Sequence, residues 1–198
     1  MTDFAVERLP PDEAFDLLAH ETRFEILEAL NGAADPVRFS DLRDAVGVRD
    51  SGQFNYHLGK LVGRFVREDD EGYRLSRAGK RVLGAVYSGG YTHVHDADPV
   101  PMATACPDCG AAMEARFGAE RVTVGCSSCD LVYTSPDIPP GVLEGWDRED
   151  VPAVVHRYVR RQLSSLDSGL CPYCDGRTDT VVCRPGDDAA PDWFTEAD

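Results

Sequence analysis

The chain has 198 residues and a formal net charge of −15, from 35 acidic and 20 basic residues. Its 42% hydrophobic content argues against a disordered acidic protein. No stretch approaches the roughly 18 uncharged apolar residues of a membrane helix. The starting segment, MTDFAVERLP, lacks the basic and apolar regions of a secretion signal. These features predict a soluble, cytoplasmic protein.

Charge is unevenly distributed along the chain. Only Lys60 and Lys80 are lysines, and acidic excess with scarce lysine resembles the proteins of salt-accumulating archaea, although a generic solubilising surface would also be acidic. Strong acidity disfavours nucleic acid as a partner. Residues 49–81, however, hold eight basic and five acidic residues, whereas residues 93–198 hold eight basic and 19 acidic ones. The locally basic stretch is where an anion is expected to bind.

Helical patterns dominate the first 63 residues. A first helix is expected to open at the segment PPD, and a second to end at Asn31-Gly32. Ser40 is expected to cap a third helix over 41–46, and Ser51 a fourth that runs to about Gly63.

A hairpin and a further helix are predicted next. Residues 65–68 and 73–75 have strand composition and flank a polar turn at 69–72. Ser76 is expected to cap a last helix, which Ser88-Gly89-Gly90 ends. Helices, a hairpin and a closing helix in this order are typical of a winged helix-turn-helix domain.

Three segments carry a family resemblance: LAHETRFEILEAL, FSDLRDAVGVRDSGQFNYHLGKLVG and FVREDDEGYRLSRAGKRVL. Together they resemble the ArsR-type winged-helix regulators, in the version found in halophilic archaea. The resemblance covers about residues 11–87 and implies DNA binding. It also implies dimerisation through the first and last helices. Some members sense metals through cysteines near the third helix, but this chain has no cysteine before Cys106.

The implied dimer surface would consist of apolar residues at both ends of the domain. Those residues are Phe15, Leu18, Val82, Val86 and Tyr87. The alternative is that they only close the core of a monomer. The sequence leaves both possibilities open.

The predicted fourth helix has two chemically distinct sides. Helical periodicity places Phe54, Leu58 and Leu61 toward a core. Tyr56, Lys60 and Gly63 then point away, with Gln53 and Asn55 near the edges. This segment holds no Asp or Glu from Ser51 to Gly63. Amide, phenol and ammonium groups without a carboxylate suit base edges and phosphates in a major groove.

The candidate DNA contacts lie on this helix and the hairpin. They are Ser51, Gln53, Asn55, Tyr56, His57, Lys60, Arg64, Arg67 and Arg74. Alternatively, the helix is an uncharged protein–protein interface, and His57 is a partly buried structural histidine. The four carboxylates at 68–71 are repelled by DNA, so the wing is expected to contribute little, or through its flanks.

Seven cysteines in a cytosolic chain indicate metal before disulfides. Cys106 and Cys109 form one Cys-x-x-Cys pair, and Cys126 and Cys129 form another, with 16 residues between the pairs. This spacing is that of a zinc ribbon, in which four thiolates fill a tetrahedral shell and leave no position for water. The expected metal is therefore a structural zinc, with an iron–sulfur centre or a redox dithiol as alternatives.

A second zinc site is predicted from Cys171, Cys174 and Cys183, with His156 or Asp187 as the fourth ligand. The alternative is a degenerate ribbon with free thiols. His93 and His95 could also bind metal, but in a linker we expect them to be solvated.

Other patterns in the second half predict short strands and one amphipathic helix. Residues 121–124 have strand composition, and 136–145 form a proline-rich loop. The helix is expected to begin at Asp147 or Asp150 and to end at Gly169. Its apolar stripe comprises Val151, Val155, Tyr158 and Leu166, widened by Val154, Val159 and Leu163.

The predicted fold class is α+β. A winged helix-turn-helix domain is expected at 1–90, a linker at 91–101, and a zinc-ribbon region with an amphipathic helix at 102–198. The predicted function is a sequence-specific DNA-binding transcriptional regulator. Its expected partners are double-stranded DNA and a second copy of the chain, and its cofactor is Zn²⁺, in one site or two.

The sequence also bears on two other function classes. An enzyme is disfavoured, because the chain lacks a Gly-rich phosphate loop, His-Glu-x-x-His and Gly-x-Ser-x-Gly. No catalytic residue is therefore predicted. The remaining alternative is a zinc-ribbon interaction module of the transcription apparatus, without sequence-specific DNA recognition, whose acidic half holds another protein.

Overall fold

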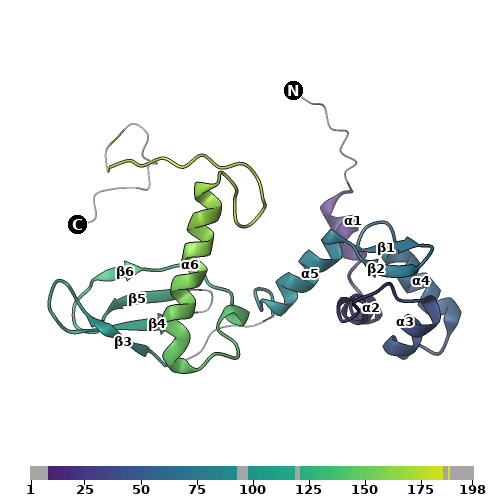
Figure 1. Cartoon of the computed structure of the whole chain (residues 1–198), viewed down its shortest axis with the longest axis horizontal. Coiled ribbons are helices and arrows are strands. Elements are labelled where there is room, and N and C mark those ends of the chain that lie inside the picture. Colours follow the sequence, from purple (N-terminus) through teal and green to yellow (C-terminus); the bar gives the residue numbers. More distant parts are fainter. Residues whose placement is uncertain (1–8, 93–97, 119–120, 185–186, 188–198) are drawn as a thin grey trace. The chain divides into compact units, whose positions relative to one another are not determined.

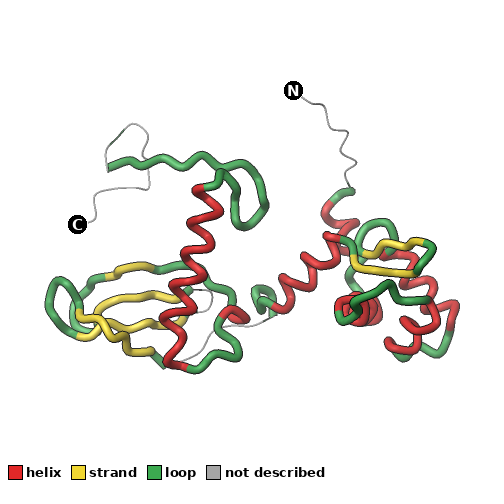
Figure 2. Tube along the Cα trace, in the orientation of Figure 1, coloured by secondary structure: helices red, strands yellow, loops and turns green. Residues whose placement is uncertain are grey.

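The computed structural model describes residues 9–92, 98–118, 121–184 and 187 (Figure 1). The chain divides into two compact units, Met1–Thr92 and His93–Asp198. Helices dominate the first unit and a four-stranded sheet with one long helix the second (Figure 2), so the predicted mixed α+β class is confirmed. Among the described helices, none has the length and apolar character needed to cross a bilayer.

The first unit has helices around a two-stranded antiparallel hairpin. In chain order its elements are α1 (Pro11–Asp16), α2 (Glu21–Asn31), α3 (Phe39–Val46), α4 (Ser51–Leu61), β1 (Val66–Asp69), β2 (Gly72–Leu75) and α5 (Arg77–Tyr87). The hairpin pairs Val66 with Leu75 and Asp69 with Gly72, so its turn is two residues long.

Helix starts differ from the sequence-based predictions at two positions. At α4 the cap is Asp50, whose carboxylate accepts the N–H of Gln53 at 2.8 Å, and Ser51 is the first helical residue. At α3 the helix begins at Phe39, and Ser40 lies inside its first turn without a capping bond. A carboxylate is favoured at a helix N-terminus, because it meets both unpaired N–H groups and the positive end of the helix dipole.

The helix α5 begins as predicted, at Ser76. Its hydroxyl accepts the N–H of Gly79 at 3.1 Å and donates to the carbonyl of Arg64 at 2.6 Å. One buried side chain therefore caps the helix and ties it to the segment that enters β1.

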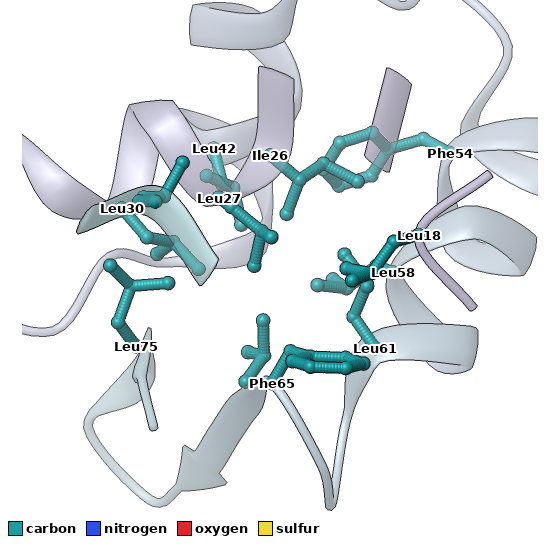
Figure 3. Packing of buried hydrophobic residues seen from close by; sticks show 12 residues of the cluster. Leu18, Ile26, Leu27, Leu30, Leu42, Phe54, Leu58, Leu61, Phe65 and Leu75 are labelled. Carbon is teal, nitrogen blue, oxygen red and sulfur yellow. The ribbon is translucent and has the colours of Figure 1, made fainter. Parts of the chain in front are cut away.

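A single apolar core holds the first unit together (Figure 3). Its buried members are Leu18, Ile26, Leu27, Leu30, Leu42, Phe54, Leu58, Leu61, Phe65, Val66, Leu75 and Leu83. Phe54, Leu58 and Leu61 reach it from α4, as the helical period predicts. Phe15 does not belong to it, since 70% of its side chain is exposed.

The second unit is an antiparallel sheet covered by a helix. The strands β3 (Val100–Ala105), β4 (Ala112–Phe117), β5 (Val122–Cys126) and β6 (Val132–Thr134) are ordered β3-β4-β5-β6. Two short 3₁₀ turns, Pro140–Val142 and Arg148–Asp150, lead to α6 (Val151–Asp167). Val151, Val155 and Tyr158 of α6 pack on sheet residues such as Ala115 and Val122, and α6 lies across the sheet in Figure 1.

Two expectations for this unit are corrected, and one open choice is decided. Val100 and Pro101 belong to β3, so they are not part of the linker predicted at 91–101. Of the two predicted starts of the helix, Asp150 is the N-cap residue of α6, whereas Asp147 precedes the 3₁₀ turn at 148–150. Leu163 is 58% exposed, since the sheet contacts only the first half of α6.

Candidate functional site

The four cysteines of the predicted ribbon lie together in the second unit. Cys106 follows β3, Cys109 lies in the turn before β4, Cys126 ends β5, and Cys129 precedes β6. Antiparallel pairing places Met113 of β4 opposite Cys126, which brings the two turns to one end of the sheet. The Sγ atoms all lie within 4.8 Å of one another.

Individual sulfur distances support a closed four-ligand site. Cys106 Sγ lies 3.7 Å from Cys129 Sγ, and Cys109 Sγ lies 3.4 Å from Cys126 Sγ. A tetrahedral ion with metal–sulfur bonds of about 2.3 Å separates its ligand sulfurs by about 3.8 Å. The four cysteines can therefore hold a metal ion such as zinc without rearranging the sheet.

Backbone groups prepare the Cys126 thiol for metal binding. The N–H groups of Ser128 and Cys129 donate to Cys126 Sγ, each at 3.3 Å. These bonds lower the pKa of the Cys126 thiol to about 6, so the thiolate predominates at neutral pH. In the other turn, Gly110 has a φ of 74°, and its N–H donates to the Cys106 carbonyl at 2.9 Å. A side chain there would strain the turn that holds Cys106 and Cys109.

The predicted second metal site does not form among the described residues. Cys171, Cys174 and Cys183 are not gathered into a group of three possible ligands. His156 is exposed on α6, and the exposed Asp187 carboxylate accepts the N–H of Arg184 at 2.7 Å. The physical reason is that, within the described part of the chain, no strand pairs the segment carrying Cys183 with the turn at 171–174, as β5 pairs with β4.

The turn at 171–174 nevertheless resembles the first pair locally. Bonds from the N–H groups of Cys174 and Tyr173 lower the pKa of the Cys171 thiol. Cys174 is exposed and Cys171 is half-buried. The alternative of a degenerate ribbon with free thiols therefore fits the arrangement. His93 and His95 lie outside the described residues.

The exposed side of α4, which we call the α4 face, consists of Gln53, Asn55, Tyr56, Gly59 and Lys60. All five are exposed, and Tyr56 has 57% of its surface accessible. The Lys60 ammonium lies 5.6 Å from the centre of the Tyr56 ring, at the distance of a cation–π contact. Ser51 is exposed at the start of the helix. The α4 face therefore offers amides, a phenol and an ammonium group to a partner.

His57 is placed differently from the other candidates. Only 5% of its surface is exposed, and its ring lies 4.1 Å from that of His20. Burial, followed by the charges of His20 and Arg23, lowers the pKa of His57. The imidazole is therefore neutral at pH 7, and its position fits the structural alternative rather than a phosphate contact.

The hairpin places its arginines in two settings. Arg64 and Arg67 are exposed, whereas Arg74 pairs with Asp69 at 3.0 Å and Glu71 at 3.1 Å. The Tyr73 hydroxyl donates to Glu68 at 2.6 Å, and this bond raises the pKa of Tyr73 to about 12. Three of the four turn carboxylates therefore have partners within the hairpin.

The first unit contains a groove that the sequence does not predict. Its lining residues come from two segments, one near the start of that unit and one near its end. Its volume is about 550 Å³, and it is lined by Phe15, Leu18, Ala19, Phe24, Arg81, Val82, Ala85, Val86, Tyr91 and Thr92. Most of these side chains are apolar. Four of the five residues of the dimer surface implied by the resemblance line it, and Tyr87, 51% exposed, does not.

Sequence reasoning also missed three arginines on α6: Arg157, Arg160 and Arg161. All three are exposed, and no acidic residue occurs from Val151 to Leu166. The feature of the sequence that indicates these arginines is the one that indicates the α4 face, a helix without carboxylates in an acidic chain. The net negative charge of the second half masks this feature.

Two family models match the chain, one in each unit. Residues 11–86, from α1 to α5, are similar to a domain of unknown function (DUF7347). Residues 103–198, which begin within β3, are similar to a second domain of unknown function (DUF7351). No curated protein and no solved structure matches the chain. The two matched segments thus correspond to the two compact units.

Proposed function

We propose that the chain is a sequence-specific DNA-binding transcriptional regulator whose first unit is a winged helix-turn-helix domain. In this reading α3 and α4 form the helix-turn-helix, α4 enters the major groove, and β1–β2 is the wing. The observation that carries the proposal is the exposed, carboxylate-free α4 face on a helix whose other side is anchored in the core. The family resemblance of residues 11–87 supports it.

The chemistry of the α4 face fits base and phosphate recognition. Asn and Gln pair with adenine through two hydrogen bonds, and a Lys ammonium binds guanine or phosphate. Anchoring by Phe54, Leu58 and Leu61, all at most 1% exposed, keeps the helix from rolling when these groups bind. Asp50 is the carboxylate nearest to the α4 face in sequence, and it accepts the Gln53 N–H at the start of the helix.

The wing plays a smaller part in this proposal. Asp69 and Glu71 already neutralise Arg74, so this arginine has little charge to offer a phosphate. Arg64 and Arg67 are exposed beside the hairpin and supply the flanking contacts. Bases read by α4 therefore dominate specificity, and the hairpin contributes orientation.

Zinc is the metal proposed for the four-cysteine site, in a structural role. Four thiolates fill a tetrahedral shell, so the ion has no open position for a substrate or for water. When bound, the ion would cross-link the two turns that flank the sheet. The residues Cys106, Cys109, Cys126 and Cys129 are its ligands.

Recognition by the α4 face is tested with Asn55→Ala and Lys60→Ala combined in one variant. Genome-wide footprinting of the tagged wild type at native salt is expected to find discrete palindromic sites. Because each base-reading contact contributes about 1–3 kcal/mol, the variant should bind such a site roughly 100-fold more weakly or worse.

The matched control combines Asn31→Ala with Lys80→Ala, which removes the same two groups from exposed positions outside α4. This control should bind the site like the wild type. Equal affinities of the two double variants, both folded and metal-loaded, would contradict the proposal. An interaction module without DNA recognition would show no discrete sites at all.

The proposed dimer uses the apolar groove between α1 and α5. Leu18 is 7% exposed and closes the core, whereas Phe15 is 70% exposed and leaves a large apolar ring beside the groove. Burying such a ring against a second copy removes it from water, and this stabilises association by about 1.5–3 kcal/mol per ring. Phe15 is thus available to a partner without being required for the monomer core.

Replacing Phe15 by glutamate is expected to shift the protein from dimer to monomer in sedimentation velocity. The control is Tyr133→Glu, which introduces the same charge at a ring 75% exposed in the second unit. The control should leave the dimer intact. A wild-type protein that sediments as a monomer would remove the dimer from the proposal while leaving DNA recognition to its own test.

A further inference from the structure

The outer side of α6 carries a cluster of basic side chains. His156, Arg157, Arg160 and Arg161 are all exposed, while Val151, Val154, Val155 and Tyr158 on the opposite side are buried. We call the three arginines the α6 arginine face. The nearest carboxylates in sequence are Asp150 and Asp167, at the two ends of the helix.

Among the described residues, three arginines of the same unit have carboxylate partners, whereas the three of the α6 arginine face have none. Arg116 pairs with Glu114, Arg121 with Asp137, and Arg177 with Asp179, all at 3.0–3.1 Å. No such pair involves Arg157, Arg160 or Arg161 among the described residues. Arg148 and Arg184 also lack such a pair among the described residues, and Arg148 donates instead to the carbonyls of Asp98 and Pro99, so the α6 arginine face is distinguished by three such arginines on one helix.

Aromatic rings hold two of the guanidinium groups in place. Arg157 lies 4.9 Å from the centre of the Trp146 ring, and Arg161 lies 5.0 Å from that of Tyr158. Stacking on a ring restricts a guanidinium but leaves its edge N–H groups available to an anion, as for Arg157, whereas Arg161 also forms a hydrogen bond with the Tyr158 side chain. The ring contacts therefore restrict two of the three guanidinium groups before an anion binds.

Like charges on this face also repel one another. Arg157 and Arg161 are four residues apart on the helix, and Arg157 and Arg160 are three apart, so their side chains are neighbours. Cationic neighbours at these spacings destabilise a helix. An anion that binds several of them at once relieves this repulsion. A polyanion with regularly spaced charges fits that requirement best.

We propose that the α6 arginine face binds the phosphate backbone of double-stranded DNA, as a second contact besides the α4 face. This inference rests on the proposed function, because DNA is already the ligand of the first unit there. Arginine binds phosphate through two parallel N–H groups, which suits it for backbone contacts. The covalent link between the units raises the local concentration of DNA near α6 once α4 is bound.

The proposal is tested with Arg157→Gln and Arg160→Gln combined in the full chain. Binding to a random-sequence duplex is measured by fluorescence anisotropy over a series of KCl concentrations. Each lost phosphate contact should lower the slope of log K against log salt by about 0.9. The affinity at about 0.1 M KCl should fall on the order of tenfold.

The matched control combines Arg121→Gln with Arg177→Gln, two arginines of the same unit that already have carboxylate partners. It removes the same charge as the α6 variant. Because the carboxylate partners already occupy these two arginines, the control should retain the wild-type slope and affinity. Metal content and circular dichroism of all variants check that the fold is retained. If the two double variants behave alike, a general charge effect explains the change and the proposal is overturned.

The α4 variant Asn55→Ala with Lys60→Ala separates this inference from the proposed function. It should lose discrimination between a footprinted site and random duplex, whereas the α6 variant should weaken both equally. An α6 variant with wild-type binding overturns only the inference about α6. An α4 variant that still discriminates between the two duplexes overturns the proposal that α4 is the recognition helix, and it leaves the inference about α6 unaffected.

A competition experiment with poly-glutamate tests the identity of the anion. If poly-glutamate competes as well as duplex at equal charge, the α6 arginine face binds an acidic polypeptide, and the DNA proposal is overturned.

Discussion

Replacing Cys126 by serine is expected to release the metal ion and unfold the second unit while the first unit stays folded. Among the four ligands, Cys126 is the one whose removal should have the largest effect, because it is buried and its sulfur accepts two backbone N–H groups. A serine hydroxyl at that position stays neutral and binds zinc far more weakly than a thiolate.

The size of the effect follows from the free energy of zinc binding. A structural zinc contributes about 10–16 kcal/mol of apparent binding free energy at neutral pH. A small domain is stable by only about 5–15 kcal/mol in total. The second unit has one sheet and one helix around its core, so loss of the ion exceeds what the remaining contacts supply.

The two cores are built from separate stretches of the chain. The buried cluster of the first unit runs from Leu18 to Leu83, and that of the second from Val100 to Tyr158. Unfolding of the second unit therefore leaves all members of the first buried cluster in place. Both tryptophans of the chain, Trp146 and Trp193, belong to residues 93–198, so their fluorescence reports on the second unit alone.

Mass spectrometry of the native protein should show one zinc per wild-type chain and none in the Cys126→Ser variant. Tryptophan fluorescence of the variant should shift to that of the unfolded chain. The control is Cys183→Ser, because the structure does not place Cys183 with the other ligands. A Cys183→Ser variant that lost zinc, or a Cys126→Ser variant that kept it, would contradict the four-cysteine assignment.

Local patterns predicted the elements of the first unit well, since periodicity reports directly on burial. Phe54, Leu58 and Leu61 share one side of α4 at helical spacing, and all three are buried. Caps were predicted less well: Ser51 and Asp50 are adjacent and both suit a cap, so the choice depends on which residue has extended backbone. His57 lies between the two sides of α4, so helical periodicity does not predict its burial, which includes a ring contact with His20 from outside the helix.

Long-range features were harder to predict because they depend on how segments meet. The spacing alone was enough to predict that four cysteines lie together, because a hairpin joins the two pairs. These cysteines are Cys106, Cys109, Cys126 and Cys129. The same reasoning does not extend to Cys183, because no strand among the residues that the structure describes returns that segment to the turn at 171–174. Leu163 fits the apolar stripe of α6 but lies beyond the sheet that covers the first half of the helix.

Replacing Gly79 by alanine is expected to destabilise the first unit by about 2–3 kcal/mol, net of the gain in helix propensity. A Cβ at this position would lie 2.4 Å from the carbonyl oxygen of Phe65 and 3.0 Å from the side chain of Leu75. The first contact is with backbone, which cannot rotate away. That carbonyl also accepts the N–H of Ser76 at 2.9 Å, so moving it weakens the start of α5.

Gly84→Ala in the same helix is the matched control. Gly84 is exposed, and a Cβ there would meet no atom within 4 Å. Alanine loses less backbone entropy than glycine in a helix, so this variant should be more stable than the wild type by up to about 1 kcal/mol. Chemical denaturation followed by far-ultraviolet circular dichroism gives both values.

The comparison isolates one contact, because both variants add the same methyl group to α5 and gain the same helix propensity. Their difference in free energy of unfolding therefore measures how closely the first turn of α5 packs on the residue that precedes β1. That packing fixes the hairpin against the core and sets the position of Val82 and Val86 beside the groove. Equal stabilities of the two variants would mean that α5 shifts freely. Neither the β1–β2 hairpin nor the proposed dimer surface would then have a fixed position relative to α4.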